Sequence, residues 1–308
     1  MVGKETGINE NKYRKPDRTF EKSGVVNPES SYYVPLENVV NKDNQDMKTM
    51  VDLGRYFSIF APRQSGKTTF LEEFCSELHQ DRTYIAIMLC FQDYSNLDIT
   101  EFYAEIELEL YEQLMNRLRD IHCEKAETVS RFLENHHLTN HISFRRLFEQ
   151  LNRIIAFKKI VIFIDEFDGI PMEELENFLT SLRKLYLKYK KVKQKSLYSI
   201  GLVGIRDITK LIVGGVSPFN IADQVDLPSF SLKNVCDLYA QYTAETNQPF
   251  EEEAPHIFPS FHRVDHARCD GHGCFSIQFG EAFTELGIIR HVKNIRTIYI
   301  DRLRLLIP

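Results

Sequence analysis

The stretch APRQSGKTT, residues 61–69, decides the fold of this chain. It lies between a short apolar run at 56–60 and a segment at 68–78 whose apolar residues recur with helical spacing. The pattern is that of a phosphate-binding loop of the Walker A type, with Ala61 at the first glycine position. Alanine fits there if its backbone stays in an allowed region. The motif requires a strand before the loop and a helix after it, and the sequence predicts both.

Each part of the loop has an expected task. Gly66 lets the backbone approach a phosphate closely, Lys67 reaches the β and γ oxygens, and the Thr68 hydroxyl is a ligand for Mg²⁺. The residues predicted to contact the nucleotide are Pro62, Arg63, Gln64, Ser65, Gly66, Lys67, Thr68 and Thr69. The loop therefore predicts binding of a nucleotide with Mg²⁺.

A second motif, KKIVIFIDEFDGIP at 158–171, supports the first. Its uninterrupted apolar run is typical of a strand covered on both faces of a parallel sheet. The run ends at Asp165 and Glu166, a Walker B type pattern, and parallel strands end along the edge where the phosphate loop lies. Asp165 is predicted to hold Mg²⁺ through Thr68 and water, and Glu166 to orient or deprotonate the attacking water. The plain alternative is a strand followed by an acidic turn.

Strands and helices alternate along the rest of the chain, which predicts a doubly wound α/β fold with a parallel sheet. The expected strands are 56–60, 83–89, 160–164, 197–204 and 221–227. The expected helices are 42–53, 68–78, 100–119, 126–135, 143–156, 172–189 and 232–246. Residues 1–22 are predicted to be a disordered lead-in, 23–230 an ATPase domain with an N-terminal arm, and 231–308 a partial helical lid.

Composition places these motifs in an ordinary globular chain. The 308 residues are 43% hydrophobic, and no apolar run approaches the length of a membrane span. The lack of such a run predicts no membrane partner, and the scattered cysteines predict reduced thiols in a cytoplasmic protein. The net charge of −6 argues against constitutive binding to nucleic acid.

With these motifs in place, the chain resembles the AAA-like ATP-binding proteins, which are related to the signal-transducing and origin-recognition branches of the AAA superfamily. The resemblance covers roughly residues 19–250 and rests on four stretches. These are FEKSGVVNPESSYYVP (20–35), GRYFSIFAPRQSGKTT (54–69), IVIFIDEFD (160–168) and SLYSIGLVGIRDI (196–208).

The resemblance implies a P-loop NTPase fold, a three-layer α/β/α sandwich with a parallel five-stranded sheet in the order 5-1-4-3-2. It also implies ATP as the nucleotide, an N-terminal arm near the adenine, and Arg206 as a catalytic residue that senses the γ-phosphate. The chain departs from the family at Leu36, where an arginine is usual, and beyond about residue 254, where a Gly-Gln-Pro lid signature is missing.

Two further segments carry competing interpretations. The tail offers possible zinc ligands in His262, His266, Cys269, His272 and Cys274, although their spacing matches no standard zinc finger. The basic run at 183–195 interleaves cations with two tyrosines, which suits either a nucleic-acid backbone or a solvated helix face.

These observations favour a slow Mg-dependent ATPase that acts as a nucleotide-dependent switch and reports its state to a protein partner, as an oligomer or alone. Two alternatives stay open: a non-hydrolysing ATP-binding scaffold and a nucleic-acid-associated ATPase.

Overall fold

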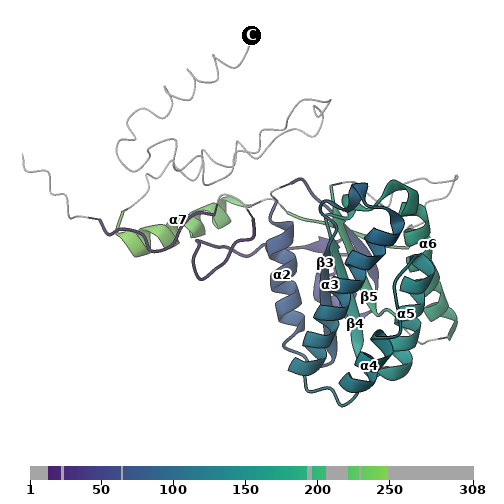
Figure 1. Cartoon of the computed structure of the whole chain (residues 1–308). Helices are drawn as coiled ribbons and strands as arrows, with labels where there is room; N and C mark the ends of the chain where they lie inside the picture. The colour runs from purple at the N-terminus through teal and green to yellow at the C-terminus, as the bar shows by residue number, and fades with distance from the viewer. Residues whose placement is uncertain are drawn as a thin grey trace, which may run out of the picture. The chain divides into compact units, whose positions relative to one another are not determined.

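The computed structural model describes residues 13–21, 24–63, 65–192, 196–205, 221–228 and 230–248 (Figure 1). The described residues belong to two compact units. The smaller unit contains the described residues up to Pro35 together with 230–248, and the larger contains those from Leu36 to Pro228. The possible zinc ligands at 262–274 and the rest of the tail lie outside the described residues.

The larger unit is an α/β structure. Its strands are β1 (Val40–Asn41), β2 (Tyr56–Phe60), β3 (Tyr84–Cys90), β4 (Lys159–Asp165), β5 (Ser199–Gly204) and β6 (Asp223–Asp226). Its α-helices are α1 (Met47–Asp52), α2 (Lys67–Leu78), α3 (Ile99–Asp120), α4 (Ala126–Leu133), α5 (His141–Ile154) and α6 (Met172–Val192). Two short 3₁₀ turns are η1 (Tyr94–Asn96) and η2 (Phe167–Gly169). None of the helices in these ranges is long and apolar enough to cross a membrane.

All six strands form one sheet in the order β1-β6-β2-β5-β4-β3. Five of them are parallel, and β1 joins β6 in antiparallel pairing at one edge. The predicted five-stranded sheet was therefore wrong in strand count and in full order, because the two-residue strand β1 is too short to show periodicity. Numbered among themselves along the chain, the five parallel strands follow one another as fifth, first, fourth, third and second.

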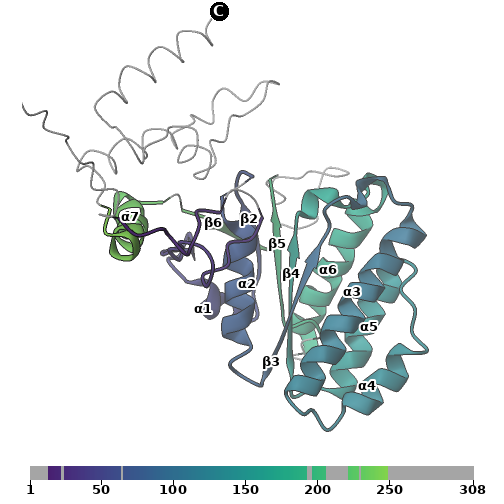
Figure 2. The same ribbon diagram turned by 60° about the vertical axis from the view of Figure 1, so that its left-hand side comes forward.

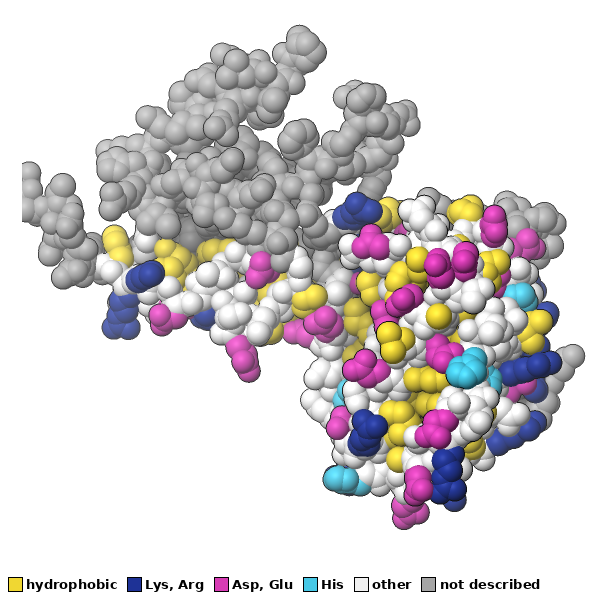
Figure 3. All heavy atoms as spheres, in the orientation of Figure 1, with side chains coloured by type: hydrophobic (Ala, Val, Ile, Leu, Met, Phe, Trp, Pro, Cys, Tyr) yellow, Lys and Arg dark blue, Asp and Glu magenta, His cyan; other side chains and the backbone are white. Residues whose placement is uncertain are grey.

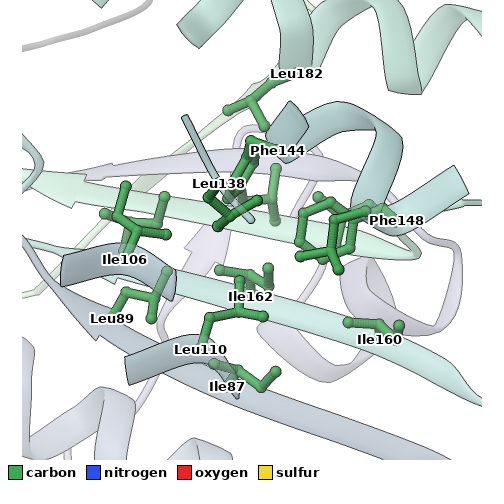
Figure 4. Packing of buried hydrophobic residues seen from close by; sticks show 14 of the residues in the cluster. Ile87, Leu89, Ile106, Leu110, Leu138, Phe144, Phe148, Ile160, Ile162 and Leu182 are labelled. Carbon is green, nitrogen blue, oxygen red and sulfur yellow. The ribbon is translucent and has the colours of Figure 1, made fainter. Parts of the chain in front are cut away.

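Helices cover both faces of the sheet, which gives three layers (Figure 2). On one face α1 and α2 pack through Met50, Leu71 and Phe74. On the other face α3 to α6 form the larger core, seen from close by in Figure 4. Strand β4 serves both cores, because Val161 and Phe163 point to the first and Ile160, Ile162 and Ile164 to the second. This alternation explains why its sequence is apolar without interruption, as expected for a central parallel strand.

Helix boundaries follow the predicted ones except at α1, which was expected to begin at residue 42. It begins at Met47 because Asp46 caps it, with the Asp46 side chain accepting a hydrogen bond from Thr49 N. The preceding residues form a turn instead, in which Asn41 Oδ1 accepts hydrogen bonds from the backbone of Asp43 and Gln45. Side-chain to backbone bonds of this kind compete with helix formation.

Strand β3 lies at the other edge of the sheet, and side chains from neighbouring helices bond its outward backbone groups. Gln113 of α3 bonds both Met88 N and Met88 O, at 3.0 and 2.6 Å. Arg117 donates to Tyr84 O, and a ring nitrogen of His79 lies 2.9 Å from Ala86 O. An edge strand with unbonded N–H and C=O groups is a template for pairing with another chain. These bonds therefore hold α3 to β3 and protect the edge.

Replacing Gln113 by alanine is expected to destabilise the fold by about 1–3 kcal/mol, the cost of leaving the partly buried N–H and C=O of Met88 unsatisfied. Thermal unfolding measures the loss, and light scattering measures the self-association that an open edge permits. Glu112→Ala is the matched control, since Glu112 is the adjacent, exposed residue of α3. An equal effect of both substitutions would contradict the edge-bonding role.

The smaller unit joins the N-terminal arm to α7 (Leu232–Thr246). Phe20, Tyr32, Val34, Phe230, Leu238 and Tyr242 form its apolar centre. The Glu245 carboxylate accepts hydrogen bonds from Arg18 Nε at 2.9 Å and Arg18 N at 3.0 Å, and Gln241 donates to Tyr33 O. Part of the segment predicted to be a disordered lead-in is thus bonded to α7, because its polar groups find partners far away in the sequence.

Candidate functional site

The phosphate loop leaves the sheet from β2, a central strand between β5 and β6. Ala61 is buried, and its N–H donates to Gly204 O at the end of β5, 3.2 Å away. Ser65 Oγ closes the loop on itself by donating to Pro62 O at 2.9 Å. The loop therefore starts from a fixed point at the carboxyl edge of the sheet.

Gly66 ends the loop and begins α2 in the left-handed region, with φ +81°. A side chain is strained at that angle, so glycine suits this position. Gly66 is the N-cap residue of α2 and has no side chain that could cap its first turn. The turn therefore presents its backbone N–H groups and the positive end of the helix dipole, an arrangement that attracts phosphate. Leu36, where the resemblance led us to expect an arginine, has its Cδ1 3.6 Å from the point where a Cβ on Gly66 would stand.

Lys67 is the buried cation of the site. Its Nζ donates to Pro62 O at 2.7 Å and to Ala61 O at 3.2 Å. Burial lowers the pKa of this ammonium, and the nearby carboxylates of Glu166, Asp165 and Asp168 oppose that shift. Burying a charge is costly unless opposite charges surround it. Its position beside the loop backbone suits an amine that binds phosphate oxygens.

Asp165 connects the two sequence motifs. It lies at the end of β4, only 1% exposed, and its Oδ2 accepts a hydrogen bond from Thr68 Oγ1 at 2.5 Å. Its Oδ1 accepts from Glu166 N at 2.9 Å. A hydroxyl and a carboxylate that meet in this way provide the hard oxygen ligands that Mg²⁺ prefers. These residues fit a Mg-nucleotide.

Glu166 follows Asp165 in the left-handed region, with φ 47° and ψ 42°. That conformation is unfavourable for a side chain by roughly 1–2 kcal/mol, and such residues cluster at functional sites. The turn η2 supports it, since Gly169 N donates to Glu166 O at 2.8 Å. Gly169 must be glycine, because a Cβ there would overlap Phe91 O.

The structure thus gathers most of the predicted residues at one place. Lys67, Thr68, Asp165 and Glu166 lie together at the carboxyl ends of β2 and β4, and Thr69 is buried in the first turn of α2. Gln64 lies outside the described residues, and so does Arg206, which was predicted to sense the γ-phosphate. No group of three or more metal-ligating side chains of His, Cys, Asp or Glu occurs in the ranges that the structure describes.

Two acidic residues near the site were missed from the sequence. Asp168 contributes to the charge around Lys67 and bonds the end of β5. Glu72 lies one turn after Thr68 on α2, and partial burial together with the charge of Asp165 raises the pKa of its carboxyl group. The sequence signal for Asp168 was present, since it is the third carboxylate in the DEFD run at 165–168. Nothing in the sequence marks Glu72 among the other glutamates of α2.

The basic run predicted as a possible nucleic-acid contact begins on α6. Among its described side chains, Lys188 pairs with Glu149 of α5 at 3.0 Å. The face in Figure 3 carries acidic side chains interspersed with hydrophobic ones over α3, where Glu101, Glu105 and Glu112 are exposed.

Comparison with known families decides the membership of the chain. The family model described as "AAA-like domain" matches residues 21–254. The chain belongs to the AAA-like domain family. The resemblance found in the four sequence stretches is thereby confirmed, and the AAA-like fold accounts for a phosphate loop at the carboxyl edge of a largely parallel sheet. Membership supports nucleotide binding.

Several solved structures share similarity with this AAA-like chain, and curated proteins gave no match. Cdc6p from Pyrobaculum aerophilum has 13% identity and a TM-score of 0.41, with 62% of this chain and 43% of that chain covered. The Aeropyrum pernix ORC1 protein, solved in complex with DNA, has 12% identity and a TM-score of 0.35, covering 68% and 51%. C. elegans PCH-2 has 13% identity and a TM-score of 0.35, covering 67% and 49%. The AAA-like chain spans about half, or less, of each of these longer chains.

Proposed function

We propose that this AAA-like chain binds ATP with Mg²⁺, hydrolyses it slowly, and acts as a nucleotide-dependent molecular switch. The contact between Thr68 Oγ1 and Asp165 Oδ2 carries the proposal, because it brings residues 97 positions apart together beside the phosphate loop, where they suit a metal-bound phosphate. The plain alternative, a strand followed by an acidic turn, gives no reason for a buried lysine and a helix N-terminus to lie beside that turn. Both are present here, which favours the nucleotide site over the plain alternative.

Each residue has a role in this proposal. Lys67 and the loop backbone, including the first-turn N–H groups of α2, bind the phosphates. Thr68 and Asp165 hold the Mg²⁺, which when bound neutralises charge on the phosphate oxygens. Glu166 orients the attacking water and accepts its proton, and Arg206 contacts the γ-phosphate. Phosphoryl transfer needs little covalent chemistry from the protein, so positioning and charge account for the catalysis.

The switch requires a part of the molecule that reports the bound nucleotide. We assign this to the smaller unit, in which α7 and the arm are joined by Glu245, Gln241 and the apolar centre. A protein partner that binds the ATP-bound form more tightly would thereby respond to the bound nucleotide.

Steady-state release of phosphate tests the proposal. We expect saturable hydrolysis that requires Mg²⁺ and stops in excess EDTA, with a turnover well below that of metabolic ATPases. DNA and RNA are not expected to stimulate it. Tight ATP binding without turnover would contradict the proposal and favour a non-hydrolysing ATP-binding scaffold. Stimulation of hydrolysis by DNA or RNA would instead identify a nucleic-acid-associated ATPase.

A further inference from the structure

The carboxylate of Asp168 makes a contact that the proposed mechanism does not use. Asp168 lies in η2, the turn that follows β4, and its Oδ2 accepts a hydrogen bond from Ile205 N at 2.5 Å. Ile205 is the first residue after β5, whose pairing with β4 has already ended at Leu202. On this side of β5 the carboxylate therefore bonds a backbone group that no longer has a strand partner.

The opposite side of β5 is bonded to the phosphate loop. Gly204 O accepts a hydrogen bond from Ala61 N at 3.2 Å, directly after the last paired residue of β2. The fit at this point is close, because a Cβ at 204 would overlap Asp168 Oδ2 and would lie 3.3 Å from Asp168 Cγ. The end of β5 is thus held between Asp168 on one side and the start of the loop on the other.

These hydrogen bonds continue to the ammonium of Lys67. Lys67 Nζ donates to Ala61 O at 3.2 Å and to Pro62 O at 2.7 Å, so the start of the loop determines where the ammonium lies. Burial lowers the pKa of Lys67, and Asp168 is one of the carboxylates whose charges oppose that shift. A path through the end of β5 therefore joins η2 to the phosphate-binding amine, and it includes none of the predicted metal ligands.

The turn that carries Asp168 is itself firmly placed. Phe167 is 2% exposed and packs within the large core, and Gly169 lies against the backbone of Phe91 at the end of β3. Residues on either side of Asp168 are thus fixed by packing. Asp168 is therefore an acceptor in a set position, and the end of β5 adjusts to it.

We infer that Asp168 is a positioning residue for the phosphate loop. By holding the end of β5 it fixes Ala61, and through the Ala61 carbonyl it fixes the ammonium of Lys67. The inference rests on the proposed function and deepens it, because it names a residue outside the two motif pairs on which phosphate binding depends. Since η2 begins directly after Glu166, one connected set of bonds holds both the water-orienting residue and the phosphate-binding amine.

Calorimetric titration with ADP and with a non-hydrolysable ATP analogue, both in Mg²⁺, tests the inference. Asp168→Ala is expected to raise both dissociation constants about ten-fold, the scale of one charge-assisted hydrogen bond. Both should rise together, because the loop and Lys67 bind phosphates that the two nucleotides share. A stoichiometry near one shows that the variant is folded. Glu173→Ala, at an exposed acidic residue of α6, is the matched control and should bind as the wild type does.

Two further variants separate positioning from charge and from misfolding. Asp168→Asn keeps an oxygen acceptor for Ile205 N but removes the charge, so it should recover most of the lost affinity. An effect of charge alone would leave it as weak as the alanine variant. Gly204→Ala displaces the Asp168 carboxylate and should weaken binding to a similar degree. In the Asp168→Ala background, where the carboxylate is gone, Gly204→Ala should add no further loss.

The possible failures are distinguishable. If the wild type binds nucleotide, the inference is overturned by unchanged affinity in Asp168→Ala, by no recovery in Asp168→Asn, or by an added loss from Gly204→Ala in the Asp168→Ala background. A wild-type protein that binds neither nucleotide would overturn the proposed function, and this inference with it. No step of the test requires turnover, so absence of hydrolysis would refute the ATPase proposal and leave the positioning role standing.

Discussion

Substituting Lys67 by alanine is expected to weaken the binding of Mg-ATP by about 10²-fold or more, since two charge-assisted hydrogen bonds to phosphate oxygens are worth roughly 3 kcal/mol together. The loss should be specific to the nucleotide. Lys67 Nζ bonds only loop carbonyls among the hydrogen bonds described for it, at Ala61 and Pro62, and a buried ammonium is costly in itself. The unliganded variant should therefore unfold near the wild-type temperature.

Thermal unfolding with and without Mg-ATP measures this. A ligand at 100 times its dissociation constant stabilises the native state by about 2.7 kcal/mol, which raises the melting temperature by several degrees. Wild type should show that shift and Lys67→Ala should lose it. Lys184→Ala is the matched control, because Lys184 is an exposed lysine of α6. A full shift in Lys67→Ala would place the nucleotide elsewhere.

Replacing Glu166 by glutamine is expected to lower ATP turnover by roughly 10²-fold or more, the scale of general-base catalysis. Glutamine keeps the size and the hydrogen bonding of the side chain but cannot accept a proton. The bonds of Lys67, Thr68 and Asp165 are unaffected, since Glu166 takes part in the Asp165 contact through its backbone N–H alone. ATP affinity should therefore stay within a few-fold of wild type.

Single-turnover hydrolysis beside equilibrium binding measures both parts of this prediction. Glu173→Gln, at an exposed glutamate in the first turn of α6, is the control for a change of charge near the sheet edge. The Glu166→Gln protein should accumulate in its ATP-bound form and retain any partner that prefers it. Equal turnover in wild type and variant would mean that Glu166 is not the base.

Much of the fold could be predicted from local patterns. The apolar run at 160–164 was predicted as a doubly covered strand and is one, because both layers of helices need an apolar surface from β4. Asp165 and the phosphate loop were predicted to lie at the same edge of the sheet because parallel strands end there, and the contact between Asp165 and Thr68 confirms this. Such features depend on periodicity and on general rules of sheet topology.

What was missed depends on tertiary contacts. Strand β1 exists because Val40 and Asn41 find β6, and two residues carry no periodic signal. The Asp168 contact depends on the distance between two strand ends, and a carboxylate in an acidic run gives no sign of which backbone N–H it will meet. The bonds from Arg18 and Tyr33 to α7 likewise join residues more than 200 positions apart.

A calorimetric titration of the wild-type chain with ATP, in Mg²⁺ and then in EDTA, tests most directly whether the loop at 61–69 and Asp165 form a Mg-nucleotide site. The structure predicts a single saturable site, clearly tighter with Mg²⁺ because Thr68 and Asp165 then act through the metal. The same titration of Lys67→Ala should show the loss of that site. Absence of binding in the wild type, or an identical binding curve for Lys67→Ala, would contradict the assignment.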